Sequence, residues 1–155
     1  MSGGLDAQGL RIGVVAARFN RFVTSRLVEG ACEALLTHGL REDDLTVCWV
    51  PGSFEVPLAA AEMARTGRWD ALVCLGAVIK GETAHFEYVA GEAARGVAEA
   101  SRDTGVPMAF GIQTTYTEEQ ALARAGGDAG NRGYDAALSA IEMANLLRKL
   151  REESG

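Results

Sequence analysis

Residues that could carry acid–base chemistry follow the most apolar run of the chain. The segment KGETAHFEYV, residues 80–89, comes after that run and holds His85, one of only two histidines. A neutral imidazole can accept or relay a proton near neutral pH. His85 falls within the first turn after an expected strand, where the positive end of a helix favours the neutral ring. Proton transfer and a local packing or hydrogen-bonding role both fit this position.

Three other side chains near expected strand ends have two possible roles each. Lys80 could form a Schiff base if it were desolvated, although a solvated lysine at a strand exit is more common. Phe19 could act as a hydrophobic staple or stack on a flat heterocycle. Glu55 has the charge that favours a following helix start, and it could equally bind a ligand hydroxyl.

Nucleotide-binding loops of the Walker type are excluded, because the sequence contains no GxxxxGK[ST] motif. No GxGxxG motif opens a helix after the first expected strand either. Arg124 and Arg132 flank a glycine-rich segment and could hold a phosphate through bidentate hydrogen bonds. Both could instead be solvated surface charges.

The charge balance argues against duplex nucleic acid as a partner. Fifteen Lys and Arg residues face 21 Asp and Glu residues, the net charge is −6, and no basic run occurs. No apolar run approaches the roughly 20 residues of a membrane span, and the first residues do not resemble a secretion signal. We therefore expect a cytoplasmic protein without a membrane partner.

The three cysteines, Cys32, Cys48 and Cys74, lie far apart in apolar surroundings. They show neither CxxC spacing nor nearby histidines. We expect all three to be buried thiols, and we expect no metal site.

Short apolar runs alternate with segments of helical periodicity. The run ALVCLGAVI is apolar throughout, which is typical of a parallel strand covered on both faces. The expected strands span residues 11–16, 45–50, 71–79 and 106–113, each followed by helical periodicity, and the last two helices span about 117–125 and 134–150. This order predicts an α/β fold, a flavodoxin-like three-layer α/β/α sandwich with a four-stranded parallel sheet. We expect a single domain over residues 1–155, with residues 1–10 as a flexible segment.

Ligands of open parallel sheets bind beyond the carboxyl ends of the strands. All four expected strand ends are polar or glycine-rich, at residues 18–20, 52–55, 80–85 and 113–115. The opposite ends carry ordinary turn residues. The sequence therefore predicts one binding edge.

Seven motifs occur in order between about residues 11 and 150: RFN, PGSFEVP, GAVIKGETAHFEYV, FGIQTT, EQALARAG, AGNRG and ALSAIEMANLL. Together they make the chain similar to the 6,7-dimethyl-8-ribityllumazine synthase family. The resemblance implies the penultimate step of riboflavin biosynthesis, in which 5-amino-6-(D-ribitylamino)uracil condenses with 3,4-dihydroxy-2-butanone 4-phosphate. It also implies that the reaction needs no cofactor and no metal.

Carried over motif by motif, the resemblance implies a role for each of a set of site residues. His85 would donate and accept protons, and Phe19 would stack on the pyrimidine. The ribitylaminouracil would bind to Ser53, Phe54, Glu55, Ala77, Val78 and Ile79; Glu82 and Thr83 would border the butanone phosphate; Arg124, helped by Arg132, would hold its phosphate; and Phe110 would enter from the adjacent chain.

Five positions depart from common patterns of the family. Arg132 stands where lysine is frequent, Lys80 where arginine is frequent, and Ala84 where threonine is frequent. The first two changes keep the charge, although arginine and lysine differ in geometry. Gln113 and Tyr116 are unusual near the end of the fourth strand.

The resemblance also implies an assembly. Family sites lie between neighbouring subunits of a pentamer, and many members join twelve pentamers into a 60-subunit icosahedral shell. Additional residues between the last two helices tend to prevent the shell, and the segment AGGDAGNRG shows no such insertion. We therefore expect a shell, with riboflavin synthase as a candidate partner.

Three other functions compete with this one. A flavodoxin-like signalling domain would need acidic residues after the first strand, where the chain has AARFN. A non-catalytic shell protein that binds flavin or lumazine would not need a phosphate site. A Schiff-base aldolase would use Lys80 and form an adduct that borohydride traps.

Overall fold

A four-stranded parallel sheet forms the centre of the molecule, whose computed structural model describes residues 1–81 and 85–154. Of the predicted site, Glu82 and Thr83 lie outside the described residues, as does Ala84. The strands lie side by side in the order β2-β1-β3-β4, and every neighbouring pair is parallel. Their bounds are β1 (Ile12–Ala17), β2 (Leu45–Val50), β3 (Ala71–Ile79) and β4 (Met108–Thr115). The predicted four-stranded α/β fold is confirmed.

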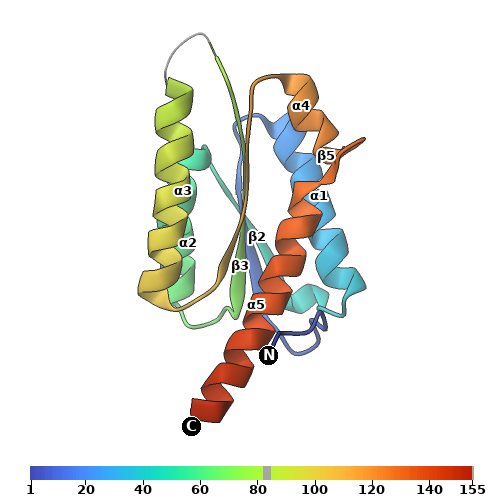
Figure 1. Cartoon of the computed structure of the whole chain (residues 1–155), viewed down its shortest axis with the longest axis vertical. Coiled ribbons are helices and arrows are strands. Elements are labelled where there is room, and N and C mark those ends of the chain that lie inside the picture. The colour runs from blue at the N-terminus through green and yellow to red at the C-terminus, as the bar shows by residue number, and fades with distance from the viewer. Residues whose placement is uncertain (82–84, 155) are drawn as a thin grey trace.

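Helices cover both faces of the sheet, as Figure 1 shows. One layer holds α1 (Arg21–Thr37), α4 (Glu118–Ala123) and α5 (Arg132–Ser154). The other layer holds α2 (Val56–Arg65) and α3 (His85–Thr104). Two short 3₁₀ turns, Glu42–Asp44 and Ser53–Glu55, complete the connections. The helices after β1 and β3, which are neighbours in the sheet, thus leave it on opposite faces, and this arrangement opens a crevice in sheets of this kind.

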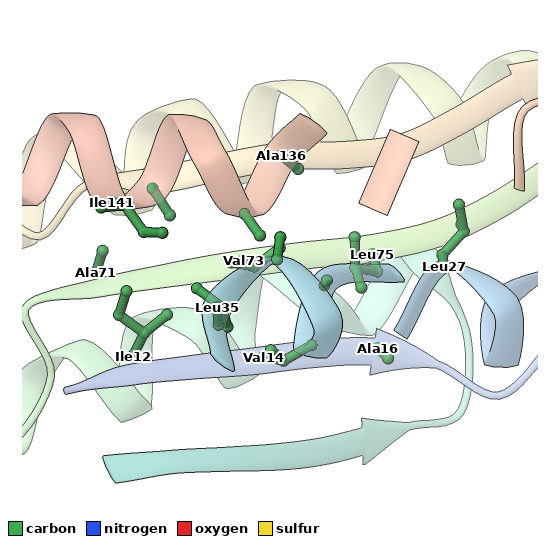
Figure 2. Packing of buried hydrophobic residues seen from close by; sticks show 14 of the residues in the cluster. Ile12, Val14, Ala16, Leu27, Leu35, Ala71, Val73, Leu75, Ala136 and Ile141 are labelled. Carbon is green, nitrogen blue, oxygen red and sulfur yellow. The ribbon is translucent and has the colours of Figure 1, made fainter. Parts of the chain in front are cut away.

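Side chains of the two central strands alternate between two hydrophobic cores. Val14 of β1 and Val73 of β3 point toward α1 and α5, as Figure 2 shows, and they pack with Leu35 and Ile141. Their neighbours along the strands, such as Cys74, point toward α2 and α3. The first eight residues of β3 are all buried, which confirms the two-sided burial expected for this strand.

Two of the four strands differ in their bounds from the prediction. β4 begins at Met108 rather than at residue 106, and Pro107 directly before it has no N–H to donate to a ladder. The strand continues to Thr115 because its pairing with β3 runs as far as Ile79. β1 is displaced by a single residue, to Ile12–Ala17.

The glycine-rich segment between the last two helices forms a two-stranded antiparallel ribbon that the sequence analysis did not predict. Its strands are β5 (Ala125–Gly127) and β6 (Gly130–Asn131). Gly126 and Gly130 both have positive φ angles, a conformation that residues with a Cβ rarely adopt. Because the ribbon begins at Ala125, α4 is shorter than expected and ends at Ala123.

The first ten residues lie against α5. Ala7 and Leu10 are fully buried, and the Asn145 amide donates to the backbone oxygens of Gly4 and Asp6 at 2.8 and 2.9 Å. Part of the segment that we expected to be flexible therefore packs into the core. Within the part of the chain that the structure describes, no helix is long and apolar enough to cross a membrane.

Only one of the three cysteines is fully buried, so the prediction was wrong for the other two. Cys74 lies in the middle of the central strand β3 and has no exposed surface. Cys48 is half-buried because β2 is an edge strand, and Cys32 is half-buried on α1. Burial raises the pKa of the Cys74 thiol from 9.0 to about 12.

This raised pKa predicts a loss of stability in alkali. In the unfolded chain the Cys74 thiol loses its proton above about pH 9, whereas in the folded chain it keeps the proton up to about pH 12. The free energy of unfolding should therefore fall as the pH rises through this window. Urea unfolding at about pH 8 and about pH 10.5 should show a smaller fall for Cys74→Ala than for the wild type. Cys48→Ala is the control, and an equal fall in all three proteins would contradict the prediction.

Candidate active site

The candidate site begins where the two central strands separate. β1 pairs with β3 only as far as Ala16 and Leu75, whereas β3 and β4 stay paired up to Ile79. On the other side, β1 stays paired with β2 through Ala17. A crevice therefore opens between β1 and β3 at the carboxyl edge of the sheet, the upper edge in Figure 1.

This crevice forms a cleft of about 640 Å³, which we call the His85 cleft. It is wide enough for a two-ring heterocycle with a polar side chain. Its walls come from the exits of β1, β2 and β3 and from the first turns of α3. The lining residues are Phe19, Asn20, Pro51, Gly52, Ser53, Phe54, Glu55, Ala77, Val78, Ile79, Gly81, His85, Phe86 and Val89.

Two exposed aromatic rings line the His85 cleft. Phe19 is 71% exposed and Phe54 is 57% exposed, unusually high values for phenylalanine. The position of Phe19 is set by the backbone, since its N–H donates to the oxygen of Pro51 at 3.0 Å. Exposed rings at a cleft wall can stack on a flat ligand, whereas a hydrophobic staple would be covered by its own helix.

Ser53 and Glu55 occupy the turn that follows β2. The Ser53 hydroxyl lies directly over Gly76, where any Cβ would collide with it, so the close approach of this turn to β3 requires glycine. Glu55 stands at the N-cap position of α2, but its side chain makes no capping hydrogen bond. The half-buried carboxylate therefore remains available to the His85 cleft.

His85 is the first residue of α3 and is exposed at the mouth of the cleft. Lys80 is also exposed, and its Nζ atom lies 5.5 Å from the centre of the Tyr116 ring. Lys80 lines neither this cleft nor the second pocket, which argues against a desolvated Schiff-base lysine.

A second pocket, of about 260 Å³, lies along β4 and holds the two arginines. We call it the arginine pocket. Its lining residues are Phe110, Gly111, Ile112, Gln113, Thr114, Thr115, Arg124 and Arg132. Two guanidinium groups beside hydroxyl and amide groups form a binding environment for an anion such as phosphate.

The backbone connects the two arginines of this pocket. The N–H of Arg132 donates to the oxygen of Arg124 at 2.8 Å, across the glycine ribbon. Asn131 accepts hydrogen bonds from Gly133 and Tyr134, which starts α5 two residues earlier than predicted and places Arg132 at its first position. Arg132 Nη1 also lies 3.2 Å from Asp135 Oδ2, in an exposed ion pair.

Thr117 and Gln120 fix the start of α4, which ends next to Arg124. The Thr117 hydroxyl accepts from the N–H of Gln120, and the Gln120 side chain accepts from the N–H of Thr117. This reciprocal capping box stabilises a helix of only six residues. At the other end, Arg124 Nη1 donates to the backbone oxygen of Gln120 at 3.0 Å.

The predicted site residues divide between the two cavities, which share no lining residue. The His85 cleft contains Phe19, Ser53, Phe54, Glu55, Ala77, Val78, Ile79 and His85, and the arginine pocket contains Phe110, Arg124 and Arg132. Of these residues, only Phe110 was expected to enter from an adjacent chain. The structure groups both arginines with Phe110 and not with His85.

Several lining residues were missed as site residues. Asn20 lines the His85 cleft, and its place in the RFN motif, within the polar strand end at residues 18–20, was the signal for it. Phe86 and Val89 of α3 pack against the core and also line the His85 cleft. Gln113 was noted only as unusual, yet it lines the arginine pocket. Within residues 1–81 and 85–154, no three His, Cys, Asp or Glu side chains lie close enough to hold a metal ion.

Comparison with protein-family models gives a match that covers almost the whole chain. Residues 9–148 match the model of 6,7-dimethyl-8-ribityllumazine synthase. The chain belongs to the 6,7-dimethyl-8-ribityllumazine synthase family. The match includes every strand of the central sheet, both cavities and α5 as far as residue 148.

Membership of the lumazine synthase family relates the chain to riboflavin biosynthesis and, in general terms, to the transferases. The resemblance that seven short motifs indicated is thus confirmed at the level of the family.

Proposed function

We propose that this chain condenses 5-amino-6-(D-ribitylamino)uracil with 3,4-dihydroxy-2-butanone 4-phosphate to form 6,7-dimethyl-8-ribityllumazine. The observation that carries the proposal is the division of the site into an aromatic, carboxylate-bearing cleft with His85 and a separate pocket with two arginines. One substrate is a heterocycle with a polyhydroxyl chain, and the other is a small phosphorylated ketone. Each cavity has the chemistry that one of them requires.

The His85 cleft suits the ribitylaminouracil. The exposed Phe19 ring can stack on the pyrimidine, which gains apolar contact without losing the hydrogen bonds of the ring edge. The Glu55 carboxylate can accept hydrogen bonds from ribityl hydroxyls, and charge-assisted bonds of this kind are stronger than neutral ones. Ala77, Val78 and Ile79 would form the flat wall on the β3 side.

The reaction itself requires orientation and proton transfer. The amine of the uracil attacks the ketone carbonyl and water leaves, phosphate is then eliminated, and a second amine closes the ring with loss of a second water. Holding both substrates together supplies much of the rate, because oriented reactants reach high effective concentrations. His85 at the mouth of the cleft would take protons from the attacking amine and return them to leaving oxygen atoms.

A complete site would need two chains, because Arg124 and His85 open into different cavities of one chain. If the arginine pocket of one subunit faced the His85 cleft of its neighbour, the substrate phosphate held by the arginines would lie close to His85. A ring of five subunits repeats this heterologous contact and closes on itself. We propose that Phe110, Arg124 and Arg132 all enter the site from the adjacent subunit of such a pentamer.

A non-catalytic shell protein that binds flavin or lumazine is the second candidate. The His85 cleft alone would serve such a carrier. The arginine pocket favours the enzyme, because 6,7-dimethyl-8-ribityllumazine contains no phosphate for the two guanidinium groups to bind. We place the enzyme in the cytoplasm, with riboflavin synthase as a candidate partner that consumes the product.

His85→Ala should lower turnover roughly 10²-fold or more, the usual contribution of a positioned proton-transfer group. Formation of the fluorescent lumazine from both substrates measures the rate, and light scattering checks that the assembly is intact. His38→Ala is the matched control, because His38 lies at the far end of α1, where its ring bonds to the oxygen of Ala34 and lies edge-on to Tyr134, and it lines neither cavity. Unchanged turnover in His85→Ala would remove the proposed role.

Co-expression of two inactive variants should restore part of the activity if the site is shared between chains. In a random mixture of His85→Ala and Arg124→Ala chains, about a quarter of the interfaces would pair an intact cleft with an intact arginine pocket. A mixture of His85→Ala and Phe19→Ala chains is the control, because both changes damage the same cavity and no interface is intact. Equal activity of the two mixtures would refute the shared site.

We propose that twelve pentamers form an icosahedral shell of 60 subunits. The connection between α4 and α5 is the short ribbon β5–β6, without the additional residues that tend to prevent the shell in the family. Light scattering of the purified protein should give a mass roughly twelve times that of a pentamer. A mass near that of one pentamer would contradict the shell and leave the shared site unaffected.

A further inference from the structure

Asn20 has an unusual backbone conformation at the floor of the His85 cleft. Its φ and ψ angles are 62° and 44°, in the left-handed region. Among the described residues it is the only residue other than glycine with a positive φ angle. Asparagine tolerates this region better than most residues, and outliers of this kind concentrate at functional sites.

The side chain of Asn20 does not cap α1, although Asn20 stands directly before this helix. Asn20 is the N-cap residue of α1, where asparagine normally accepts a hydrogen bond from the first turn of the helix. No such capping bond is present. Instead, Asn20 Nδ2 donates to the backbone oxygen of Ala77 in β3 at 2.8 Å.

The Ala77 carbonyl faces the side of β3 from which β1 has departed. Backbone groups of a strand alternate in direction, and Leu72 and Lys80 donate toward β4, to the oxygens of Pro107 and Thr115. Odd-numbered residues of β3 therefore face β1. Pairing with β1 ends at Leu75, so Ala77 is the first carbonyl on that side without a strand partner.

We infer that Asn20 is a positioning residue of the proposed reaction. Its hydrogen bond to Ala77, which we call the tether, replaces the missing pairing between β1 and β3. The tether holds Phe19 at a fixed distance from the β3 wall of the cleft. Phe19 is already bound to the β2 side of the cleft through the oxygen of Pro51. With Asn20 bound to Ala77, the Phe19 backbone is held from both walls. The inference rests on the proposed function, because the role of the tether is to place the ring that stacks on the pyrimidine.

Asn20→Asp tests the tether with almost no change of shape. The carboxylate cannot donate to the Ala77 carbonyl, so the KM for the ribitylaminouracil should rise roughly tenfold. The KM for the butanone phosphate should not change, because Asn20 lies outside the arginine pocket. Asn145→Asp is the matched control, since it also removes an amide bond to backbone oxygens, those of Gly4 and Asp6, at a place remote from the cleft.

Asn20→Gly separates the tether from the backbone conformation. Glycine adopts the left-handed region freely, so this variant keeps the turn and loses only the amide. It should show the same rise in KM as Asn20→Asp. A wild-type KM in Asn20→Gly would overturn the inference, as would an equal rise of both KM values in Asn20→Asp together with a lower melting temperature.

Binding of 6,7-dimethyl-8-ribityllumazine, measured through its fluorescence, distinguishes a failure of the proposed function from a failure of the Asn20 tether. A wild type that neither forms nor binds the lumazine would reject the proposed function. A wild type that forms it, with Asn20 variants that bind it as tightly, would reject the tether alone. We expect the dissociation constant to rise roughly tenfold in both Asn20 variants and to stay unchanged in Asn145→Asp.

Discussion

The separation of β1 from β3 is the constraint on which the site depends. The two strands form the centre of the sheet, yet their pairing stops at Ala16 and Leu75 while the outer pairings continue. Helices α1 and α3 follow these two strands on opposite faces, which leaves a crevice between the strand ends. Backbone groups at the gap must find other partners, since buried carbonyls without hydrogen bonds are costly. Asn20 supplies one such partner, at Ala77.

Small residues let the second wall of the cleft approach the sheet. In the turn after β2, the Ser53 hydroxyl contacts Gly76 of β3. This contact brings the turn close to the sheet, and Phe54 and Glu55 therefore line the crevice. Opposite charges are kept apart, because Glu55 opens into one cavity and Arg124 into the other. A guanidinium beside Glu55 in the same chain would pair with it and occupy the groups that the substrates need.

Much of this arrangement could be predicted from residue patterns. The strand ALVCLGAVI was predicted with its observed bounds, because a fully buried strand is apolar at every position. Errors occurred at the periphery, where packing decides the outcome. Cys48 was expected to be buried but lies on an edge strand, and α5 starts at Arg132 because Asn131 caps it. The ribbon β5–β6 is too short for any periodicity to indicate it.

The sequence by itself determined the fold class, the binding edge and the family, because each depends on local periodicity or on motifs that lie close together in the chain. It also determined which residue types could do chemistry. Only the tertiary structure decided how those residues are grouped. His85 follows the exit of β3 and Arg124 follows α4, and they open into different cavities, since α3 and α4 cover opposite faces of the sheet. Whether a polar residue faces a cleft depends on contacts between segments distant in sequence, such as that of Asn20 with Ala77, and no local pattern encodes them.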